Sequence, residues 1–292
     1  MKDKTLGYKI FTICNNILMA IIIFIMAYPL YYVVIASFSD SASLMSHSGT
    51  LWLPLKPFTL DAYKLVLENP SIISGYRNTL FILVVGVILN LILTIMGAYF
   101  LSCKNIKYKN IVVIMIIITM YFSGGMIPTY FNIRDLGLLN TLWALIIPGA
   151  ISTSNLIIMR TAFDSIPDSL IESASLDGAS HARILSQIMV PLAVPTIAVM
   201  VLYYGVGHWN SWFSASIYLR DRELFPLQLI LREILITNQM AEMSGDDIGD
   251  MAQMAQLIKY ALIVVSTAPI LAIYPFLQKY FVKGVMVGAI KG

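Results

Sequence analysis

Long uncharged stretches alternate with charged segments along this chain. Six windows of at least 19 residues contain no Asp, Glu, Lys or Arg: 10–39, 78–103, 110–133, 136–159, 184–219 and 260–278. A charged side chain at the centre of a bilayer costs about 2.5–3.5 kcal/mol on insertion scales, and a helix needs about 20 residues to cross the hydrocarbon. The pattern therefore predicts six transmembrane helices, with cores at 11–35, 79–101, 110–128, 139–160, 192–212 and 260–279.

The composition supports a single membrane domain over residues 1–292. Hydrophobic residues make up 58% of the chain and charged residues 12%, about half of the roughly 25% that soluble domains carry. A soluble enzyme of this size could not cover its surface with so few charges, which excludes that class. The net charge of +3 gives no support to nucleic-acid binding. The high hydrophobic fraction and the low charged fraction instead make membrane lipid the expected surrounding.

Positively charged residues favour one orientation in the membrane. With a cytoplasmic N-terminus, eleven of the 19 Lys and Arg residues fall inside, mostly in short segments against helix ends, where the positive-inside rule applies. Both termini are therefore predicted to be cytoplasmic, with external loops at 40–77 and 213–258. For the second loop, a helix lying on the membrane and a pore-lining or partner-docking role both stay open.

Residues 164–191, between the fourth and fifth predicted spans, form a cytoplasmic segment with clear helix boundaries. Asp164 or Ser165 can accept hydrogen bonds at the start of a helix. Gly178 predicts a stop, because glycine adopts a positive φ without a Cβ penalty, and Ser180 can cap a second helix. The segment is thus predicted to be two short helices that meet at a glycine corner, which fits either a rigid protrusion for a partner or an ordinary cytoplasmic loop.

The glycine corner resembles the EAA signature of the permease subunits of ATP-binding-cassette (ABC) importers. That signature has Glu-Ala-Ala, Gly, Ile and Leu-Pro at fixed offsets, and the matching residues here are Glu172-Ser173-Ala174, Gly178, Ile188 and Val190-Pro191. Asp177-Gly178-Ala179 is similar to the carbohydrate-importer version of the signature. Ser173 and Val190 depart from the signature, both as small changes.

The resemblance covers nearly the whole chain. Asn78-Thr79 at the second span, Gly207-His208-Trp209-Asn210 at the end of the fifth, and residues 283–292 are similar to sugar-importer permeases. In size and in number of spans the chain is similar to the smaller permease subunit of the maltose importer and to oligosaccharide permeases. The resemblance implies an all-α membrane protein of the type I ABC importer permease fold, with a cytoplasmic coupling helix, in the bacterial cytoplasmic membrane.

The resemblance also implies a use for the glycine corner. In that family the corner is a coupling helix that rests on a cytoplasmic ATPase, and it moves the membrane helices between inward- and outward-facing states. Glu172 would hold the ATPase surface, Ala174 would permit close packing, and Gly178 would set the corner. The ATPase-coupling residues implied in this chain are Glu172, Ser173, Ala174, Asp177, Gly178, Ala179, Ile188 and Pro191.

A non-catalytic subunit is the expectation for this chain. It contains no G-x-x-x-x-G-K-[ST] phosphate loop, so ATP and Mg²⁺ would be bound by partner ATPases and no cofactor by the chain itself. The resemblance implies two ATPase subunits, a second permease that is a different but homologous chain, an extracellular solute-binding protein, and a sugar or oligosaccharide substrate. His47, His181 and His208 are dispersed, so no shared metal site is expected, and His181 is interpreted as an exposed loop residue.

Polar and aromatic residues inside the predicted spans are candidates for a solute path. Uncharged polar residues in a membrane tend to face the interior of a helix bundle, and aromatic rings can contact the apolar faces of sugars. The alternative for the aromatic residues is the belt at the membrane interface. A secondary transporter is the main alternative function, but no carboxylate or lysine lies inside a span to couple ions. The candidate path residues are Asn90, Tyr121, Asn155, Tyr203, Trp209 and Asn210.

Overall fold

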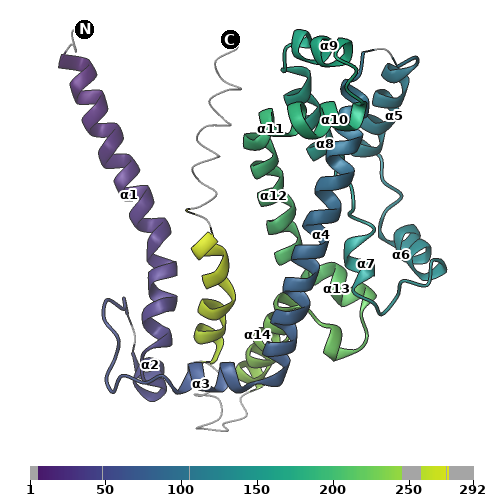
Figure 1. The fold of residues 1–292 in the computed structure, drawn as a ribbon. Helices are drawn as coiled ribbons and strands as arrows, with labels where there is room; N and C mark the ends of the chain where they lie inside the picture. The colour runs from purple at the N-terminus through teal and green to yellow at the C-terminus, as the bar shows by residue number, and fades with distance from the viewer. Residues whose placement is uncertain (1–5, 48, 105, 245–257, 274, 276–292) are drawn as a thin grey trace. The chain divides into compact units, whose positions relative to one another are not determined.

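The structure, a computed structural model, describes residues 6–47, 49–104, 106–244, 258–273 and 275. These residues form helices and connecting segments, and none of them lies in a β-strand, which confirms the all-α prediction (Figure 1). The chain divides into two compact units, Met1–Asn69 with Glu233–Ala268, and Pro70–Arg232 with Pro269–Gly292. The predicted end of the sixth span and the segment 283–292 lie outside the described residues.

One long apolar helix dominates the first unit. α1 (Leu6–Ser37) has 32 residues and a window of mean hydropathy 2.4, so it is long and apolar enough to cross a membrane. The loop that follows folds back on the second half of α1. There the Leu51 N–H donates to the Tyr28 hydroxyl at 3.0 Å, and the rings of Tyr28 and Trp52 lie 5.3 Å apart. The predicted core 11–35 therefore lies within a single helix.

Short helices occupy the predicted external loop 40–77. α2 (Ser41–Ser46) is capped by Asp40, whose carboxylate accepts the Ser43 N–H at 3.0 Å, and α3 (Asp61–Glu68) follows. The unit also holds the second part of α14 (Leu227–Ser244) and most of the apolar helix Ile258–Ile273. Residues 245–257 of the second predicted loop lie outside the described residues.

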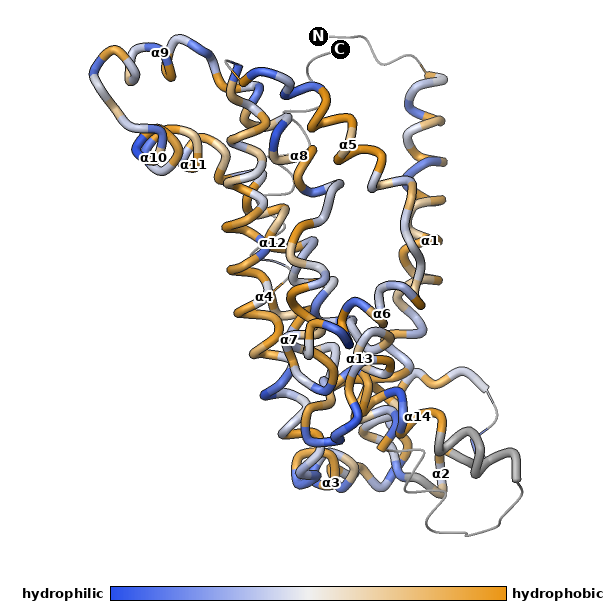
Figure 2. The backbone as a smooth tube through the Cα atoms, turned by 90° about the vertical axis from the view of Figure 1, so that its right-hand side faces the viewer, coloured by the Kyte–Doolittle hydropathy of each residue, from blue (hydrophilic) through white to orange (hydrophobic). Residues whose placement is uncertain are grey.

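The second unit is built around α4 (Pro70–Ser102), which packs along α8 (Thr153–Asp164) and α12 (Val194–Trp209). α4 has a window of mean hydropathy 2.7. Its 33 residues make a helix of about 50 Å, longer than the roughly 30 Å of hydrocarbon in a bilayer. Figure 2 shows α4 and α12 as mainly hydrophobic. Residues at both ends of α4 can therefore lie outside the membrane.

The predicted span 110–128 is broken in the structure. α5 (Lys109–Tyr121) and α6 (Met126–Asp135) are bent by 112° relative to each other. Gly125, just before α6, has φ of 86°, which favours glycine, and Pro128 lies in the first turn of α6, where its missing N–H costs nothing. An uncharged window therefore does not guarantee a continuous helix.

The predicted span 139–160 also differs from the structure. α7 (Trp143–Ile146) has only 4 residues, and a non-helical segment, 147–152, separates it from α8. Pro148 has no backbone N–H with which to continue α7, and the Ser152 side chain caps α8 by accepting the Asn155 N–H at 3.4 Å. The segment 147–152 leaves backbone groups that need partners elsewhere.

The predicted span 192–212 corresponds mainly to α12. An 83° bend at Ala193 separates α12 from the helical run that precedes it, His181–Leu192, and α13 (Trp212–Tyr218) follows. By length and composition, α1 and α4 are candidate spans, and two bent pairs of helices add two more. The helix Ile258–Ile273, in the predicted span 260–279, is apolar but shorter. Six spans therefore stay a prediction.

Candidate functional site

The glycine corner has the predicted shape. α9 (Asp168–Leu176) ends in the Gly178 turn, and α10 (His181–Ile184) begins after it, capped by Ser180, whose hydroxyl accepts the Arg183 N–H at 3.4 Å. Gly178 has φ of 78°. In Figure 1 this pair of helices lies at the Ser102 end of α4. The prediction of two short helices meeting at a glycine is confirmed.

A Schellman motif closes α9 at this corner. The Gly178 N–H donates to the Ser175 carbonyl at 3.1 Å, and the Ala179 N–H donates to the Ala174 carbonyl at 2.9 Å. Ala174 and Ala179 are both partly buried against the apolar core of the second unit. The EAA-like residues thus have a local reason for their spacing, because they build the helix end and its contact with the bundle.

The start of α9 differs from the prediction. Pro167 precedes the helix and makes no side-chain cap. Asp164 instead ends α8, where its carboxylate pairs with the Arg160 Nε at 3.3 Å, and the Ser165 hydroxyl donates to a carbonyl of α8. Both side chains therefore serve the end of α8 and not the start of α9. The sequence pattern did not distinguish these two uses.

The other implied coupling residues lie mostly on the surface of the corner. Glu172, Ser173, Asp177 and Pro191 are exposed, and Ile188 is half-buried in the π-helical turn η1 (Leu185–Met189). No residue of α9 is buried. Leu176, at the end of α9, is 88% exposed. The corner thus presents polar side chains and one large apolar side chain on its exposed surface.

Two residues that sequence reasoning missed also contact the corner. Tyr99, in the last turn of α4, and Lys104, just after it, contact His181 and Asp168 respectively. His181 is exposed, as expected from the sequence, and its Nδ1 lies 2.8 Å from the Tyr99 hydroxyl. The sequence carried no signal for this pairing, since the two residues are 82 positions apart.

A buried polar centre lies further along α4. Asn90 is fully buried, and its Nδ2 donates to the carbonyls of Gly149 and Ala150, each at 2.8 Å. Its Oδ1 lies 2.7 Å from the His208 Nε2 on α12. Gly86 faces this ring, and a Cβ there would lie 2.5 Å from Nε2. Asn90 therefore provides hydrogen-bond donors to two carbonyls of the non-helical segment 147–152 and links that segment to α4 and α12.

A second set of bonds completes this centre. The Tyr204 hydroxyl on α12 accepts the Ser152 N–H at 3.1 Å and lies 2.7 Å from the Thr94 Oγ1 on α4. Thr94 and Tyr204 are buried. The polar centre thus consists of Asn90, Thr94, Ser152, Tyr204 and His208, and it supplies partners that a broken helix lacks.

The six candidate path residues are not brought together in the described part of the chain. Asn90, Asn155 and Trp209 are buried, whereas Tyr121, Tyr203 and Asn210 are exposed. The Asn210 amide donates to the Val206 carbonyl of its own helix at 3.0 Å. Trp209 lines an apolar cavity of about 440 Å³ between α4 and α12. Their role in a solute path stays a prediction.

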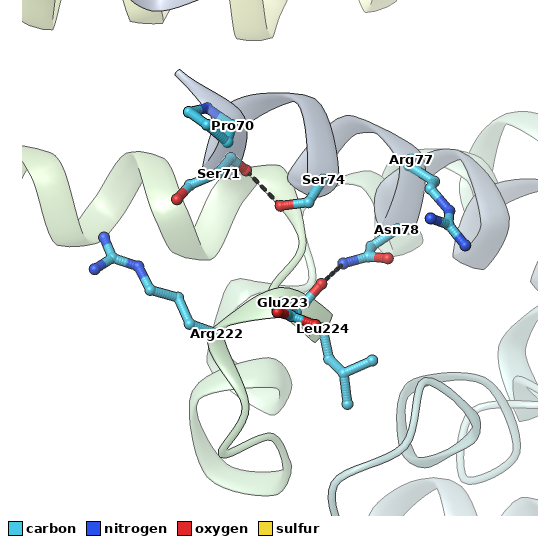
Figure 3. Close-up of a pocket in the computed structure, with 8 residues that line it drawn as sticks. All are labelled: Pro70, Ser71, Ser74, Arg77, Asn78, Arg222, Glu223 and Leu224. Atoms are coloured by element: carbon cyan, nitrogen blue, oxygen red, sulfur yellow. Dashed lines mark hydrogen bonds between the residues drawn. The ribbon is translucent and has the colours of Figure 1, made fainter. Parts of the chain in front are cut away.

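A polar pocket lies at the Pro70 end of α4, opposite the glycine corner. It has a volume of about 480 Å³, and Arg77 and Arg222 extend on different sides of it (Figure 3). The Asn78 Nδ2 donates to the carbonyl of Glu223 at 2.7 Å. The Thr79 hydroxyl accepts the N–H of Leu227, the first residue of α14, at 2.9 Å. Asn78 and Thr79 therefore anchor the pocket wall formed by the turn η2 (Arg222–Leu224).

Nothing in the described part of the chain resembles a metal centre. No group of three His, Cys, Asp or Glu residues could hold an ion there. The arrangement instead offers a protruding corner at one end of α4, a polar pocket at the other end, and a polar centre between them.

Comparison with known proteins relates this arrangement to a family. The family described as "Binding-protein-dependent transport system inner membrane component" matches residues 106–287. Protein LplC of Bacillus subtilis strain 168 is 41% identical over 289 residues, covering 99% of this chain and 97% of LplC. The polygalacturonan/rhamnogalacturonan transport system permease protein YtcP of the same organism is 38% identical over 271 residues, covering 90% and 92%.

A solved structure agrees with the sequence relatives. One chain of a bacterial ABC transporter involved in the import of the acidic polysaccharide alginate superposes with a TM-score of 0.86 at 34% identity. The match covers 95% of this chain and 98% of that one.

Proposed function

Because this chain belongs to the family of binding-protein-dependent transport system inner membrane components, we propose that it is the permease subunit of an ATP-driven importer of a sugar or oligosaccharide. The observation that carries the proposal is the glycine corner, which places EAA-like residues on an exposed pair of helices at one end of α4. The similarity to sugar and polysaccharide transport proteins supports the choice of solute.

The proposed topology has six spans with both termini in the cytoplasm. α1, α4, the two bent pairs and the helix Ile258–Ile273 supply apolar helical segments for it. The charge distribution then assigns the glycine corner to the cytoplasm and the pocket beside Pro70 to the external side. The proposed ATPase would therefore contact the glycine corner at one end of α4, and the proposed solute-binding protein would contact the other end.

In the proposed cycle, the glycine corner rests on a partner ATPase that binds ATP and Mg²⁺. Leu176 supplies an exposed apolar contact and Glu172 an exposed charge. ATP binding would move the corner, and the helices joined to it would change the side from which the solute path is open. This chain binds no nucleotide in the proposal and acts as a non-catalytic subunit.

The proposed assembly has a second permease, two ATPases and an extracellular solute-binding protein. One chain offers one corner, so two ATPases need two permeases. The second permease would complete the solute path, which agrees with candidate residues that are split between buried and exposed positions. The pocket between Arg77 and Arg222 lies where the solute-binding protein would deliver its load.

Acidic oligosaccharides are the first solutes to test. YtcP is named for polygalacturonan and rhamnogalacturonan, and the solved relative for alginate. Uronate carboxylates would be attracted by the two arginines at the external pocket. Neutral arabino-, galacto- and malto-oligosaccharides form the comparison set, because other relatives are named for these sugars.

Purification and uptake test this function together. Tagged chain purified from its native membrane should carry an ATPase and a second permease. The complex in liposomes, with the solute-binding protein supplied on the outside, should take up one member of the panel only with ATP inside. Uptake driven by a proton or sodium gradient without ATP would instead support a secondary transporter. A chain that purifies without an ATPase and shows no ATP-dependent uptake would contradict the proposal.

A further inference from the structure

Two polar links join the end of α4 to both helices of the glycine corner. Lys104, just after α4, forms an ion pair with Asp168, the first residue of α9. The Tyr99 hydroxyl bonds the Nδ1 of His181, the first residue of α10, at 2.8 Å, and their rings meet edge to face at 6.0 Å. Each helix of the corner therefore has its own contact with the same end of α4.

A cavity separates the corner from α4 between these links. It has a volume of about 590 Å³, and all four linking residues line it. α9 has no buried residue and reaches the apolar core only through partly buried side chains such as Ile171 and Ala174. Few contacts therefore fix the direction of α9, and the Lys104–Asp168 ion pair is one of them.

The charges around Lys104 also favour a role for this residue in fixing the direction of α9. The pKa of Lys104 is raised, first by its hydrogen bond and charge attraction to Asp168, and further by the carboxylates of Glu172 and Asp164. Lys104 is thus the cation that faces the acidic residues of the corner. Its side chain is 71% exposed and that of Asp168 is 51% exposed, so the pair contributes little to folding stability. Its loss should change the direction of α9 rather than unfold the protein.

We propose that Lys104 is a positioning residue that holds α9, and with it Glu172, in one orientation relative to α4. The Tyr99–His181 bond does the same for α10. When the corner moves, the Lys104–Asp168 and Tyr99–His181 contacts then move α4 with it. Without them, α9 and α10 could shift into the cavity while α4 stays in place. This inference rests on the proposed function, because the corner has to be moved by an ATPase for the links to transmit anything.

Spin-label distances in the purified complex test the positioning directly. Cys14 and Cys103 are replaced by serine, and nitroxides are attached at Ser169 in α9 and Thr161 in α8, both exposed positions outside the implied ATPase contact. The parent complex should give one narrow distance distribution, which shifts when ATP is added. Lys104→Asp should broaden the distribution and abolish the shift, and Lys104→Asp with Asp168→Lys should restore both.

Matched variants separate the link from a general charge effect. Lys107→Asp makes the same charge change in the same loop, at an exposed lysine for which the structure records no ion pair among the described residues, and it should leave the distribution narrow. Lys104→Gln and Tyr99→Phe remove one link each without adding a charge, and each should broaden the distribution less than Lys104→Asp.

Each possible result either supports or overturns the Lys104–Asp168 link. A narrow distribution in Lys104→Asp, a broad one in Lys107→Asp, or a charge swap that stays broad would each overturn the link. If the parent complex contains no ATPase, the proposed function fails, while the distances without ATP still decide whether Lys104 orients α9. ATP hydrolysis that continues in Lys104→Asp while the distance shift is lost would support transmission through the link.

Discussion

At the scale of single residues, the Asn90 side chain satisfies several buried polar groups at once. Its amide binds two carbonyls of a non-helical segment and the ring of His208, all within a unit whose helices are apolar enough to cross a membrane. No water is available in a bilayer to replace these bonds, so each lost partner leaves a polar group unsatisfied. Asn90 is therefore expected to determine whether the segment 147–152 keeps its conformation.

Asn90→Leu should destabilise the purified complex. The substitution leaves the carbonyls of Gly149 and Ala150 without their donor, at about 1–3 kcal/mol for each unpaired buried group. Thermal unfolding in detergent should show a lower midpoint. Asn110→Leu, at an exposed position of α5, is the matched control and should leave the midpoint almost unchanged. Equal midpoints for the two variants would contradict the role of Asn90.

Gly86→Ala tests the same centre from the other side. The added Cβ would lie 2.5 Å from the His208 Nε2, so the ring has to move and its bond to Asn90 is lost. Overpacking of this kind costs about 1–3 kcal/mol. Gly207→Ala adds the same methyl group with nothing within 4 Å, and should not lower the unfolding midpoint. A stable Gly86→Ala protein would show that the ring is free to move.

Local rules explain which residues the sequence could predict. Gly178 and Ser180 behave as predicted because turn and cap preferences depend on neighbouring backbone alone. The roles of Asn90 and His181 could not be predicted in the same way, since their partners are distant in sequence. Asn90 stays a candidate for the solute path, because polarity within a span does not reveal whether a side chain binds a solute or satisfies a broken backbone.

At the scale of elements, the glycine corner depends on one backbone conformation. Nothing lies within 4 Å of a Cβ built at Gly178, so a larger residue would meet strain from its φ of 78° and not from crowding. The same turn brings Ala174 and Ala179 into contact with the apolar core. Changing this φ would therefore alter the direction of α10 relative to α9.

Gly178→Val should uncouple the transporter while leaving it in the membrane. A residue with positive φ and a Cβ costs about 1–2 kcal/mol, and β-branching adds to the resistance. Membrane fractionation should recover normal amounts of the variant, and ATP-dependent uptake should fall. Gly178→Asn is the matched control, because asparagine tolerates positive φ, and it should keep most of the uptake. Wild-type uptake by Gly178→Val would count against the corner.

Breaks within the predicted spans show what hydropathy misses. Gly125 and Pro128 interrupt the third predicted span, and Pro148 lies where the fourth is interrupted, yet these residues carry no charge and leave the uncharged windows intact. Charge spacing predicts where a chain can enter a membrane. Continuity of a helix depends instead on φ preferences and missing N–H groups, which require separate inspection of each Gly and Pro.

At the scale of the whole molecule, the second unit has the glycine corner and the polar pocket at opposite ends of α4. The pocket with Arg77 and Arg222 lies at one end of a helix of about 50 Å, and the glycine corner lies at the other. A transporter that receives solute on one side and energy on the other requires such a separation. The polar centre joins α4, α12 and the segment before α8 between these ends.

The sequence could predict the family and the corner, but not a solute path. Family resemblance depends on residues within this chain, whereas the proposed path would be shared with a second permease. The six candidate residues do not converge in the described part of the chain. The pairing of Lys104 with Asp168 could not be predicted either, because two exposed charges on different elements have no sequence pattern in common.

The most direct test of the account is to ask what touches the corner. A photo-cross-linking amino acid is placed at Leu176, which is 88% exposed in α9, and at Leu53, which is 75% exposed in the predicted external loop 40–77, and the native membranes are irradiated. The account predicts that Leu176 captures an ATPase and that Leu53 does not. Capture of no ATPase at Leu176, or labelling of a cysteine at this position by a membrane-impermeant reagent added outside intact cells, would contradict it.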